Sequence, residues 1–234
     1  MDISVVIPCF NESEAVSPLA RRLDELLKQL ESDYETEFVF VDDGSTDNTF
    51  ERLKTLYQDR KSVSIVRHTS NQGLGAAIRT GLSHAKGHFQ VVIDSDCTYD
   101  PLIIPDMLRQ MEPDVDILTA SPYAPGGRVL NVDRFQIFIS QWCSKLYRII
   151  LRSDIHTFTC MFRIYRKSVW DTVSFQSNTF LSMAEIITQA IQRKLNVQEF
   201  PTTLSARQHG YSKRKILRLT LEHLRLMALL IQKK

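Results

Sequence analysis

The N-terminal half of the chain alternates between short apolar runs and longer amphipathic segments. The runs ISVVIPCF (3–10) and EFVFVDDGS (37–45) are rich in β-branched or aromatic residues, which is typical of strands buried on both faces. One face of the segment between them is apolar, as in a helix: Leu19, Leu23, Leu26, Leu27 and Leu30. Further strands are predicted over 63–68, 88–96 and 115–121, and further helices over 47–58, 74–87 and 103–111. This order predicts a mostly parallel sheet with helices on both faces.

The pattern changes from about residue 122. Residues 122–127 (PYAPGG) read as a loop because of their proline and glycine content. The elements expected after it are a helix over 134–151, a strand over 158–166, a helix over 183–194, an extended segment over 197–207 and an amphipathic helix over 215–234.

Composition narrows the class of protein. The chain of 234 residues is 43% hydrophobic and 24% charged, as expected of a globular protein with a core. Its net charge of +2 gives no basis for a nucleic-acid partner. The four cysteines form no C-x-x-C pair, so a zinc site has little support. The first ten residues have no basic region before the apolar run, so we expect no signal peptide and a cytoplasmic protein.

Acidic residues follow three of the predicted strands. Glu12 comes after the first, Asp42 and Asp43 after the second, and Asp94 and Asp96 after the fourth. Ligands of doubly wound sheets bind at the carboxyl ends of strands, so these side chains are expected to face one crevice. An acidic strand end is also what a helix N-cap looks like, but three such ends at one edge favour a site.

The spacing of Asp94 and Asp96 suits a divalent cation. Two carboxylates in a D-x-D arrangement offer the oxygen ligands that Mg²⁺ and Mn²⁺ prefer, and leave room for phosphate oxygens. A metal there would neutralise a departing nucleoside diphosphate. No Walker A sequence is present, and no G-x-G-x-x-G follows the first strand. We therefore expect a nucleoside diphosphate bound through acids and metal rather than a glycine-rich loop.

Four segments in order carry a family resemblance: VVIPCFNESE, VFVDDGSTDNT, NQGLGAAIRTGL and VVIDSDCTYDP. Together they resemble the family 2 glycosyltransferases, and within them the dolichol- and polyprenyl-phosphate sugar synthases. The later segments FTCMFRIYR and ARQHGYSK are similar to the same family. The resemblance implies an α/β, glycosyltransferase A-type (Rossmann-like) fold with a mostly parallel central sheet and C-terminal amphipathic helices. It also implies a nucleotide-sugar donor and a divalent metal, Mg²⁺ or Mn²⁺.

The resemblance assigns roles residue by residue. The donor-binding residues that it implies are Pro8, Phe10, Glu12, Asp42, Asp43, Asp94, Asp96, Arg207, Ser212 and Lys213. Asp94, Asp96, Arg207 and Lys213 would act directly in catalysis, by binding the metal or the phosphates. Thr98 stands where the mannose synthases of the family have glutamine, and would be a third metal ligand.

The acceptor side departs from the family pattern. The family often reads SRY where this chain has SPY, with Pro122, and a second expected arginine falls on Gln136. Arg128 and Arg134 are the expected substitutes, together with Ser140. Glu185 either orients the acceptor or is a polar residue at the mouth of a helix, and the sequence leaves both interpretations open. A lipid-phosphate acceptor is already anionic and needs no general base.

The helices expected over 134–151 and 215–234 combine leucine, isoleucine and aromatic residues with arginine and lysine. Such helices suit a peripheral position at the cytoplasmic face of a membrane. Alternatively, they pack on the sheet or form a dimer contact. No apolar stretch reaches the roughly 20 residues that span a bilayer.

The expected function is inverting transfer of one sugar from GDP-mannose or a UDP-sugar to a polyprenyl phosphate. One alternative is an enzyme of the same fold with a soluble or protein-linked acceptor, and another is a non-catalytic protein that binds nucleotide sugars. The absence of a Q-x-x-R-W motif argues against a processive polysaccharide synthase. The chain is expected to form one domain over 1–234, with a donor half (1–121), an acceptor half (122–213) and a C-terminal helix (214–234).

Overall fold

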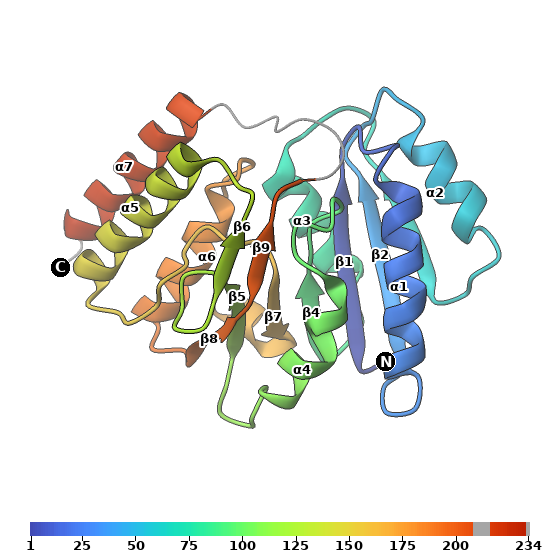
Figure 1. Ribbon diagram of the computed structural model, residues 1–234, viewed down its shortest axis with the longest axis horizontal. Helices are drawn as coiled ribbons and strands as arrows, with labels where there is room; N and C mark the ends of the chain where they lie inside the picture. The colour runs from blue at the N-terminus through green and yellow to red at the C-terminus, as the bar shows by residue number, and fades with distance from the viewer. Residues whose placement is uncertain (208–215, 233–234) are drawn as a thin grey trace.

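The computed structural model describes residues 1–207 and 216–232, and its centre is a seven-stranded sheet (Figure 1). The strand order is β3-β2-β1-β4-β7-β5-β8, and only β7 runs antiparallel to its neighbours. The strands are β1 (Ile3–Cys9), β2 (Thr36–Asp42), β3 (Val63–Arg67), β4 (Phe89–Val92), β5 (Ile117–Ser121), β7 (Arg163–Arg166) and β8 (Val197–Pro201). The short strands β6 (Arg128–Leu130) and β9 (Thr203–Ser205) pair separately. The predicted mostly parallel α/β sheet is confirmed.

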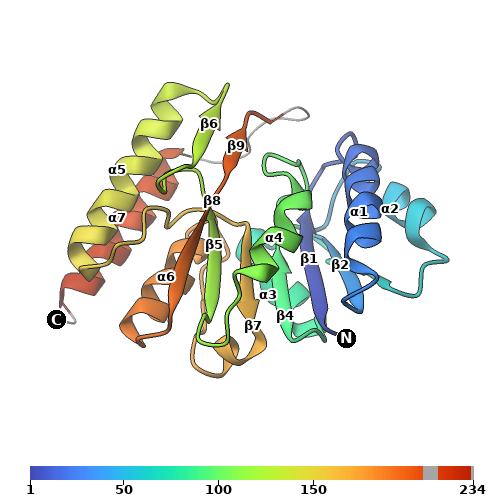
Figure 2. The ribbon, with the colours of Figure 1, turned by 60° about the horizontal axis from the view of Figure 1, so that its bottom comes forward.

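Helices cover both faces of the sheet (Figures 1 and 2). They are α1 (Val16–Leu30), α2 (Thr49–Tyr57), α3 (Leu74–His84), α4 (Ile104–Arg109), α5 (Arg134–Leu151), α6 (Ser182–Gln192) and α7 (Ile216–Gln232), with 3₁₀ turns at Pro101–Ile103 and Lys167–Asp171. Every residue of β1 and β2 is buried, and their side chains alternate between two apolar layers. Phe38 and Phe40 pack with α1, α2 and α4, whereas Val39 and Val41 pack with α3 and α6.

Strand β7 is shorter than the predicted strand over 158–166, and the first residue of β7 is a buried arginine. Arg163 is fully buried. Its guanidinium donates to the carbonyl oxygens of Phe158 at 2.9 Å and Met183 at 2.7 Å, and to Thr119 Oγ1 at 3.2 Å. Arg163 thus joins β5, β7 and α6 to the irregular segment 158–162.

Helices α5 and α7 lie side by side at one end of the molecule (Figures 1 and 2). A buried hydrogen bond of 2.9 Å joins the Tyr147 hydroxyl to Nδ1 of His223, and Tyr147 stacks on Phe158 at 5.1 Å. Both helices leave large apolar side chains exposed: Phe135, Phe138, Trp142 and Ile149 on α5, and Leu221, Leu224, Leu229 and Ile231 on α7. None of the helices among the described residues is long and apolar enough to cross a bilayer.

The pairing of α5 with α7 is expected to weaken in acid. Burial lowers the pKa of His223 from 6.5 to about 4, against a smaller raising effect of Glu222. The unfolded chain therefore takes up a proton near pH 6.5 that the folded chain refuses, and stability falls as pH drops from 6.5 towards 4. Between pH 7 and 5 the free energy of unfolding should fall by about 2 kcal/mol from this group alone.

Urea unfolding of the wild type and of His223→Gln at pH 7 and 5 measures this effect. Glutamine still accepts a hydrogen bond from Tyr147 but does not titrate, so His223→Gln should lose less stability on acidification. Equal losses in the two proteins would contradict the assignment.

Candidate active site

A cavity of about 690 Å³ opens at the carboxyl ends of β1, β2 and β4 and extends towards α5 and α7. Nine of the predicted site residues line it: Pro8, Phe10, Glu12, Asp43, Asp94, Asp96, Thr98, Ser140 and Arg207. The carboxyl ends of parallel strands do meet at one edge, as the sequence predicted. Ser212 and Lys213 lie outside the described residues.

Four predicted residues do not line the cavity: Asp42, Arg128, Arg134 and Glu185. Arg128 begins β6, and Arg134 is the exposed first residue of α5. The carboxylate of Glu185 accepts the backbone N–H groups of Gln176 at 3.1 Å and Ser177 at 2.9 Å. These two bonds attach the loop before α6 to the first turn of that helix.

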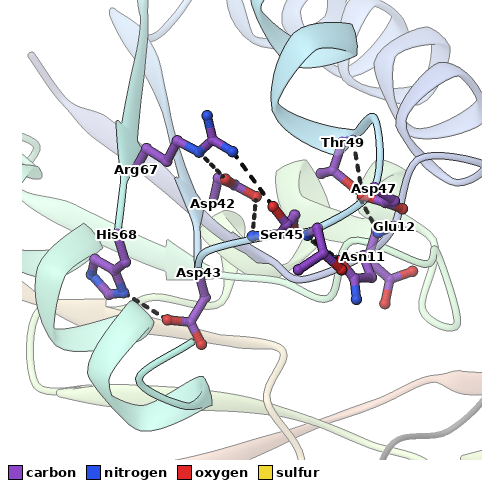
Figure 3. A network of polar contacts seen from close by, with 10 residues as sticks. Asn11, Glu12, Asp42, Asp43, Ser45, Asp47, Thr49, Arg67 and His68 are labelled. Atoms are coloured by element: carbon purple, nitrogen blue, oxygen red, sulfur yellow. Dashed lines mark hydrogen bonds and ion pairs between the residues drawn. The ribbon is translucent and has the colours of Figure 1, made fainter. Parts of the chain in front are cut away.

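The two aspartates that end β2 have different surroundings (Figure 3). Asp42 is fully buried, 3.1 Å from Nε of Arg67 but without hydrogen-bond geometry to it. The guanidinium of Arg67 in turn lies over the ring of Phe50, 4.3 Å from its centroid. Asp42 therefore neutralises an arginine at the end of β2, next to the residues that line the cavity.

Asp43 organises the wall of the cavity (Figure 3). Its Oδ1 lies 2.6 Å from Nδ1 of His68 and accepts the N–H of Gln72 at 2.9 Å, while Oδ2 accepts the N–H of Gly73 at 2.8 Å. Nε2 of His68 lies 3.0 Å from Thr80 Oγ1 on α3. One carboxylate thus fixes the entry to α3 against the end of β2.

Glycines let the start of α3 approach the segment before α6. A Cβ on Gly73 would lie 2.3 Å from the carbonyl oxygen of Asn178, and one on Gly75 would lie 2.0 Å from that of Ser177. The N–H of Gly75 also donates to the Asn178 carbonyl at 3.0 Å. The glycines of NQGLGAAIRTGL therefore form a close contact that shapes the cavity.

Backbone hydrogen bonds direct the Glu12 side chain into the cavity (Figure 3). Asn11 has a φ of 52°, a left-handed conformation that asparagine tolerates well. Its N–H donates to Ser45 Oγ at 2.9 Å, and the N–H of Glu12 donates to Thr49 Oγ1 at 2.8 Å. The end of β1 is thereby attached to the loop after β2, and the Glu12 carboxylate is left for side-chain contacts.

Arg207 joins the acids of two strand ends. Its Nη2 forms an ion pair with Glu12, and its Nε lies 3.4 Å from Oδ2 of Asp96. Burial lowers the pKa of Arg207, but Glu12, Asp96 and Asp94 outweigh it and raise that pKa above its ordinary value. The guanidinium is a permanent cation among these carboxylates.

The turn after β4 presents Asp94 and Asp96 to the cavity. The N–H of Thr98 donates to Asp96 Oδ1 at 3.1 Å, and the N–H of Ser205 donates to the carbonyl of Thr98 at 2.9 Å. Within 1–207 and 216–232 no group of three histidine, cysteine or acidic residues forms a complete metal site. Two carboxylates fit a magnesium-type ion that takes its other ligands from phosphate and water.

Cys9 and Cys160 line the same cavity but are poor nucleophiles. Burial, together with Glu12 and Asp42, raises the pKa of Cys9 far above neutrality, and burial raises that of Cys160 to about 11. Both thiols stay protonated at neutral pH, so nothing in their chemistry points to a covalent intermediate.

Comparison with known proteins decides the family. Residues 4–173 match the model of the family described as glycosyl transferase family 2. The chain belongs to glycosyltransferase family 2. The predicted resemblance is confirmed.

Two curated relatives of this family 2 chain act on lipid phosphates by name. It is 33% identical over 217 residues to a dolichol-phosphate mannosyltransferase of Pyrococcus furiosus, covering 92% of this chain and 60% of the relative. It is 29% identical over 217 residues to a dodecaprenyl-phosphate galacturonate synthase of Rhizobium johnstonii, covering 91% and 62%. The chain therefore spans about three fifths of the length of these relatives.

A solved structure supports the glycosyltransferase A-type fold. The glucosyl-3-phosphoglycerate synthase of Mycobacterium tuberculosis, in complex with Mn²⁺, UDP and phosphoglyceric acid, superposes with a TM-score of 0.71 at 17% identity. The match covers 99% of this family 2 chain and 78% of the synthase.

Two groups of residues that line the cavity were not predicted from the sequence. Asn178, Thr179 and Phe180 come from the segment before α6, and Arg218, Leu219 and Glu222 come from α7. They lie outside the motifs, and tertiary packing of α6 and α7 brings them to the cavity. The polar run QSNT (176–179) was the one available signal.

Replacing the central carboxylate of the cavity wall should release the entry to α3. Asp43→Ala removes the acceptor of two backbone N–H groups and of His68, so the free energy of unfolding should fall by about 2–4 kcal/mol. Hydrogen exchange at Gln72 and Gly73 should accelerate, as read from the peptide that spans them. The exposed Asp59→Ala is the matched control, and unchanged exchange at 72–73 in Asp43→Ala would refute this role.

Proposed function

We propose that this chain transfers one sugar from a nucleoside-diphosphate sugar to a polyprenyl phosphate, with inversion and with a divalent metal. The observation that carries the proposal is the meeting of Glu12, Asp94, Asp96 and Arg207 in one cavity of a family 2 chain. The lipid phosphates named for two curated relatives support the acceptor. Those names differ in sugar, so both GDP-mannose and UDP-sugars are candidate donors.

Asp94 and Asp96 are the proposed metal-binding residues, with the Thr98 hydroxyl beside them. The Mn²⁺ and UDP bound by the mycobacterial synthase support a metal in this fold. A bound metal would act as a Lewis acid that lowers the charge of the departing diphosphate. Arg207 is a permanent cation in the same cavity and can form charge-assisted hydrogen bonds with phosphate oxygens.

The proposed nucleophile is the phosphate oxygen of the acceptor. It is anionic at neutral pH, so the chain need only position it opposite the leaving diphosphate for in-line attack and inversion. Most carboxylates in the described part of the cavity are proposed metal ligands or have hydrogen-bond or ion-pair partners, and Asp133 caps α5. The protein's contribution is then orientation and electrostatic stabilisation.

The outer faces of α5 and α7 support a peripheral position at the cytoplasmic face of a membrane. Phe138 and Trp142 are 57% and 53% exposed, one helical turn apart on α5. Burying such side chains at the headgroup boundary of a bilayer stabilises the attached state. A polyprenyl acceptor would be met at the same surface.

A soluble acceptor is the second candidate. Pro122 and Gln136 line the cavity at positions where the resemblance leads one to expect arginines. The solved structure that matches this fold contains phosphoglyceric acid, a soluble phosphate. A protein that binds nucleotide sugars without turnover is the third candidate.

A donor-panel assay tests the three. GDP-mannose, UDP-glucose and UDP-N-acetylglucosamine are each supplied with Mn²⁺ or Mg²⁺, with and without a short polyprenyl phosphate. Metal-dependent sugar in the lipid fraction is the expected result. Donor consumed only with a soluble phosphate ester would favour the second candidate, and donor bound but never consumed the third.

Loss of a proposed metal ligand should abolish transfer without unfolding the chain. Asp96→Ala loses a long ion pair and one hydrogen bond but also relieves repulsion with Asp94 and Glu12, so the melting temperature should change little. Turnover should fall by about 10³-fold because several kcal/mol of charge stabilisation are lost. Rates and thermal unfolding are compared with those of Asp106→Ala, an exposed acid on α4. Turnover in Asp96→Ala close to that of the control would contradict the assignment of Asp96 as a metal ligand.

Removing two exposed aromatic side chains should weaken membrane attachment. Phe138→Ser with Trp142→Ser should lower partitioning onto phosphatidylcholine–phosphatidylglycerol vesicles by about tenfold, from the apolar area lost. The matched control is Leu56→Ser on α2, which is 41% exposed on a distant helix. Sedimentation with vesicles gives the readout, and equal partitioning of all variants would argue against this surface.

A further inference from the structure

The acceptor end of the cavity contains a cation to which no role has been assigned. Among the described residues that line the cavity, the positive side chains are Arg207 and Arg218. Arg207 is engaged with Glu12 and Asp96, the residues proposed to face the donor. Arg218 belongs to α7, which packs against α5 at the opposite end.

Arg218 is held in place at one end of its guanidinium and open at the other. Its Nε donates to Oε1 of Glu222 at 3.0 Å, and Oε2 of Glu222 accepts the hydroxyl of Thr179 at 2.6 Å. The Arg218 side chain is 70% exposed, whereas Glu222 is 18% exposed. Among residues 1–207 and 216–232, the terminal nitrogens of Arg218 form no hydrogen bond or ion pair. They form the planar fork that binds phosphate in bidentate fashion.

Helix stability does not explain an arginine at this position. Arg218 lies in the first turn of α7, where the helix dipole disfavours a cation. Its partner Glu222 is four residues further along, which is the weaker order for an i,i+4 ion pair. Exposed pairs of this kind contribute little to stability in any case. The position of Arg218 therefore does not stabilise α7, but it places a cation at the cavity.

Neutral hydrogen-bonding groups line the cavity together with Arg218. The hydroxyls of Ser140 and Thr159 lie 3.0 Å apart, and Gln136 is on the same helix as Ser140. Leu221 and Leu224 follow Arg218 along α7, at 57% and 50% exposure. A phosphate at Arg218 would thus share the cavity with hydroxyl groups, and the exposed Leu221 lies one helical turn further along α7.

We propose that Arg218, positioned by Glu222 and Thr179, binds the phosphate group of the acceptor. The proposal rests on the proposed transfer reaction for its substrate class, a phosphate monoester. It assigns to α7 the role that the sequence expected of Arg128 and Arg134, neither of which lines the cavity.

Binding of a water-soluble acceptor analogue tests the proposal without a membrane. Citronellyl phosphate is titrated calorimetrically into the full chain at saturating nucleoside diphosphate and Mn²⁺. Arg218→Gln should weaken its binding by about 10- to 100-fold, as expected for the loss of a charge-assisted hydrogen bond, and Arg218→Lys should restore part of it. The affinity for the nucleoside diphosphate should stay unchanged, which separates this loss from misfolding.

Arg225→Gln is the matched control, because Arg225 lies two turns further along α7 and does not line the cavity. Binding that is equally strong in Arg218→Gln and Arg225→Gln would overturn the proposal. So would a wild type that binds no phosphate monoester.

Two further arms separate this inference from the proposed function. Glycerol 3-phosphate and inorganic phosphate are titrated in the same way. If they bind as tightly as citronellyl phosphate and depend on Arg218, the phosphate site stands but the lipid acceptor fails. If the wild type labels lipid phosphate and Arg218→Gln leaves the acceptor KM unchanged, the lipid acceptor stands and the role of Arg218 fails.

Discussion

Carboxylates from three neighbouring strand ends lie at one edge of the sheet, and the repulsion between them is the constraint on which the site depends. The fold offsets it differently at each strand. After β2, Asp42 is neutralised by an arginine, and Asp43 by backbone N–H groups and a histidine. After β1 and β4, Glu12 and Asp96 share Arg207, which follows β9. The acids of β2 thus have backbone, histidine and arginine partners on neighbouring strands and loops, whereas Glu12 and Asp96 are balanced by the same arginine.

The charge balance of Glu12 and Asp96 affects how a nucleotide-sugar donor would bind in the cavity. A nucleoside diphosphate alone meets Glu12, Asp94 and Asp96 as a like charge. Asp94 and Asp96 would hold a divalent cation that lowers this negative charge, and Arg207 could then form charge-assisted hydrogen bonds with phosphate oxygens. Donor and metal are thus expected to bind together, because each offsets a charge that the other brings.

The parts of the site that the sequence predicted are those encoded locally. Buried strands ending in acids specify a parallel sheet and a charged edge, because strand direction determines where those ends meet. The sequence could not distinguish the surroundings of Asp42 and Asp43, because Asp42 ends β2 and Asp43 begins the loop after it, where tertiary contacts set the partners. The substitutes expected from the sequence for the missing arginines, Arg128 and Arg134, do not line the cavity, whereas α7 reaches it through its packing against α5. Glu185 was ambiguous for the same reason, because its partners lie in a loop without a periodic pattern.

Helices α5 and α7 connect the cavity to the exposed apolar surface. Their inner sides contribute Ser140 and Glu222 to the cavity, while their outer sides leave aromatic and aliphatic residues in solvent. Exposing an apolar surface of this kind to water costs free energy. Such surfaces mark sites where a protein binds a partner or a membrane. The buried bond between Tyr147 and His223 fixes the spacing of the two helices, so it also fixes the distance from the cavity to that surface. An acceptor with a phosphate head and an apolar tail matches this order of polar cavity and apolar exterior, whereas a small soluble phosphate would use only the first of them.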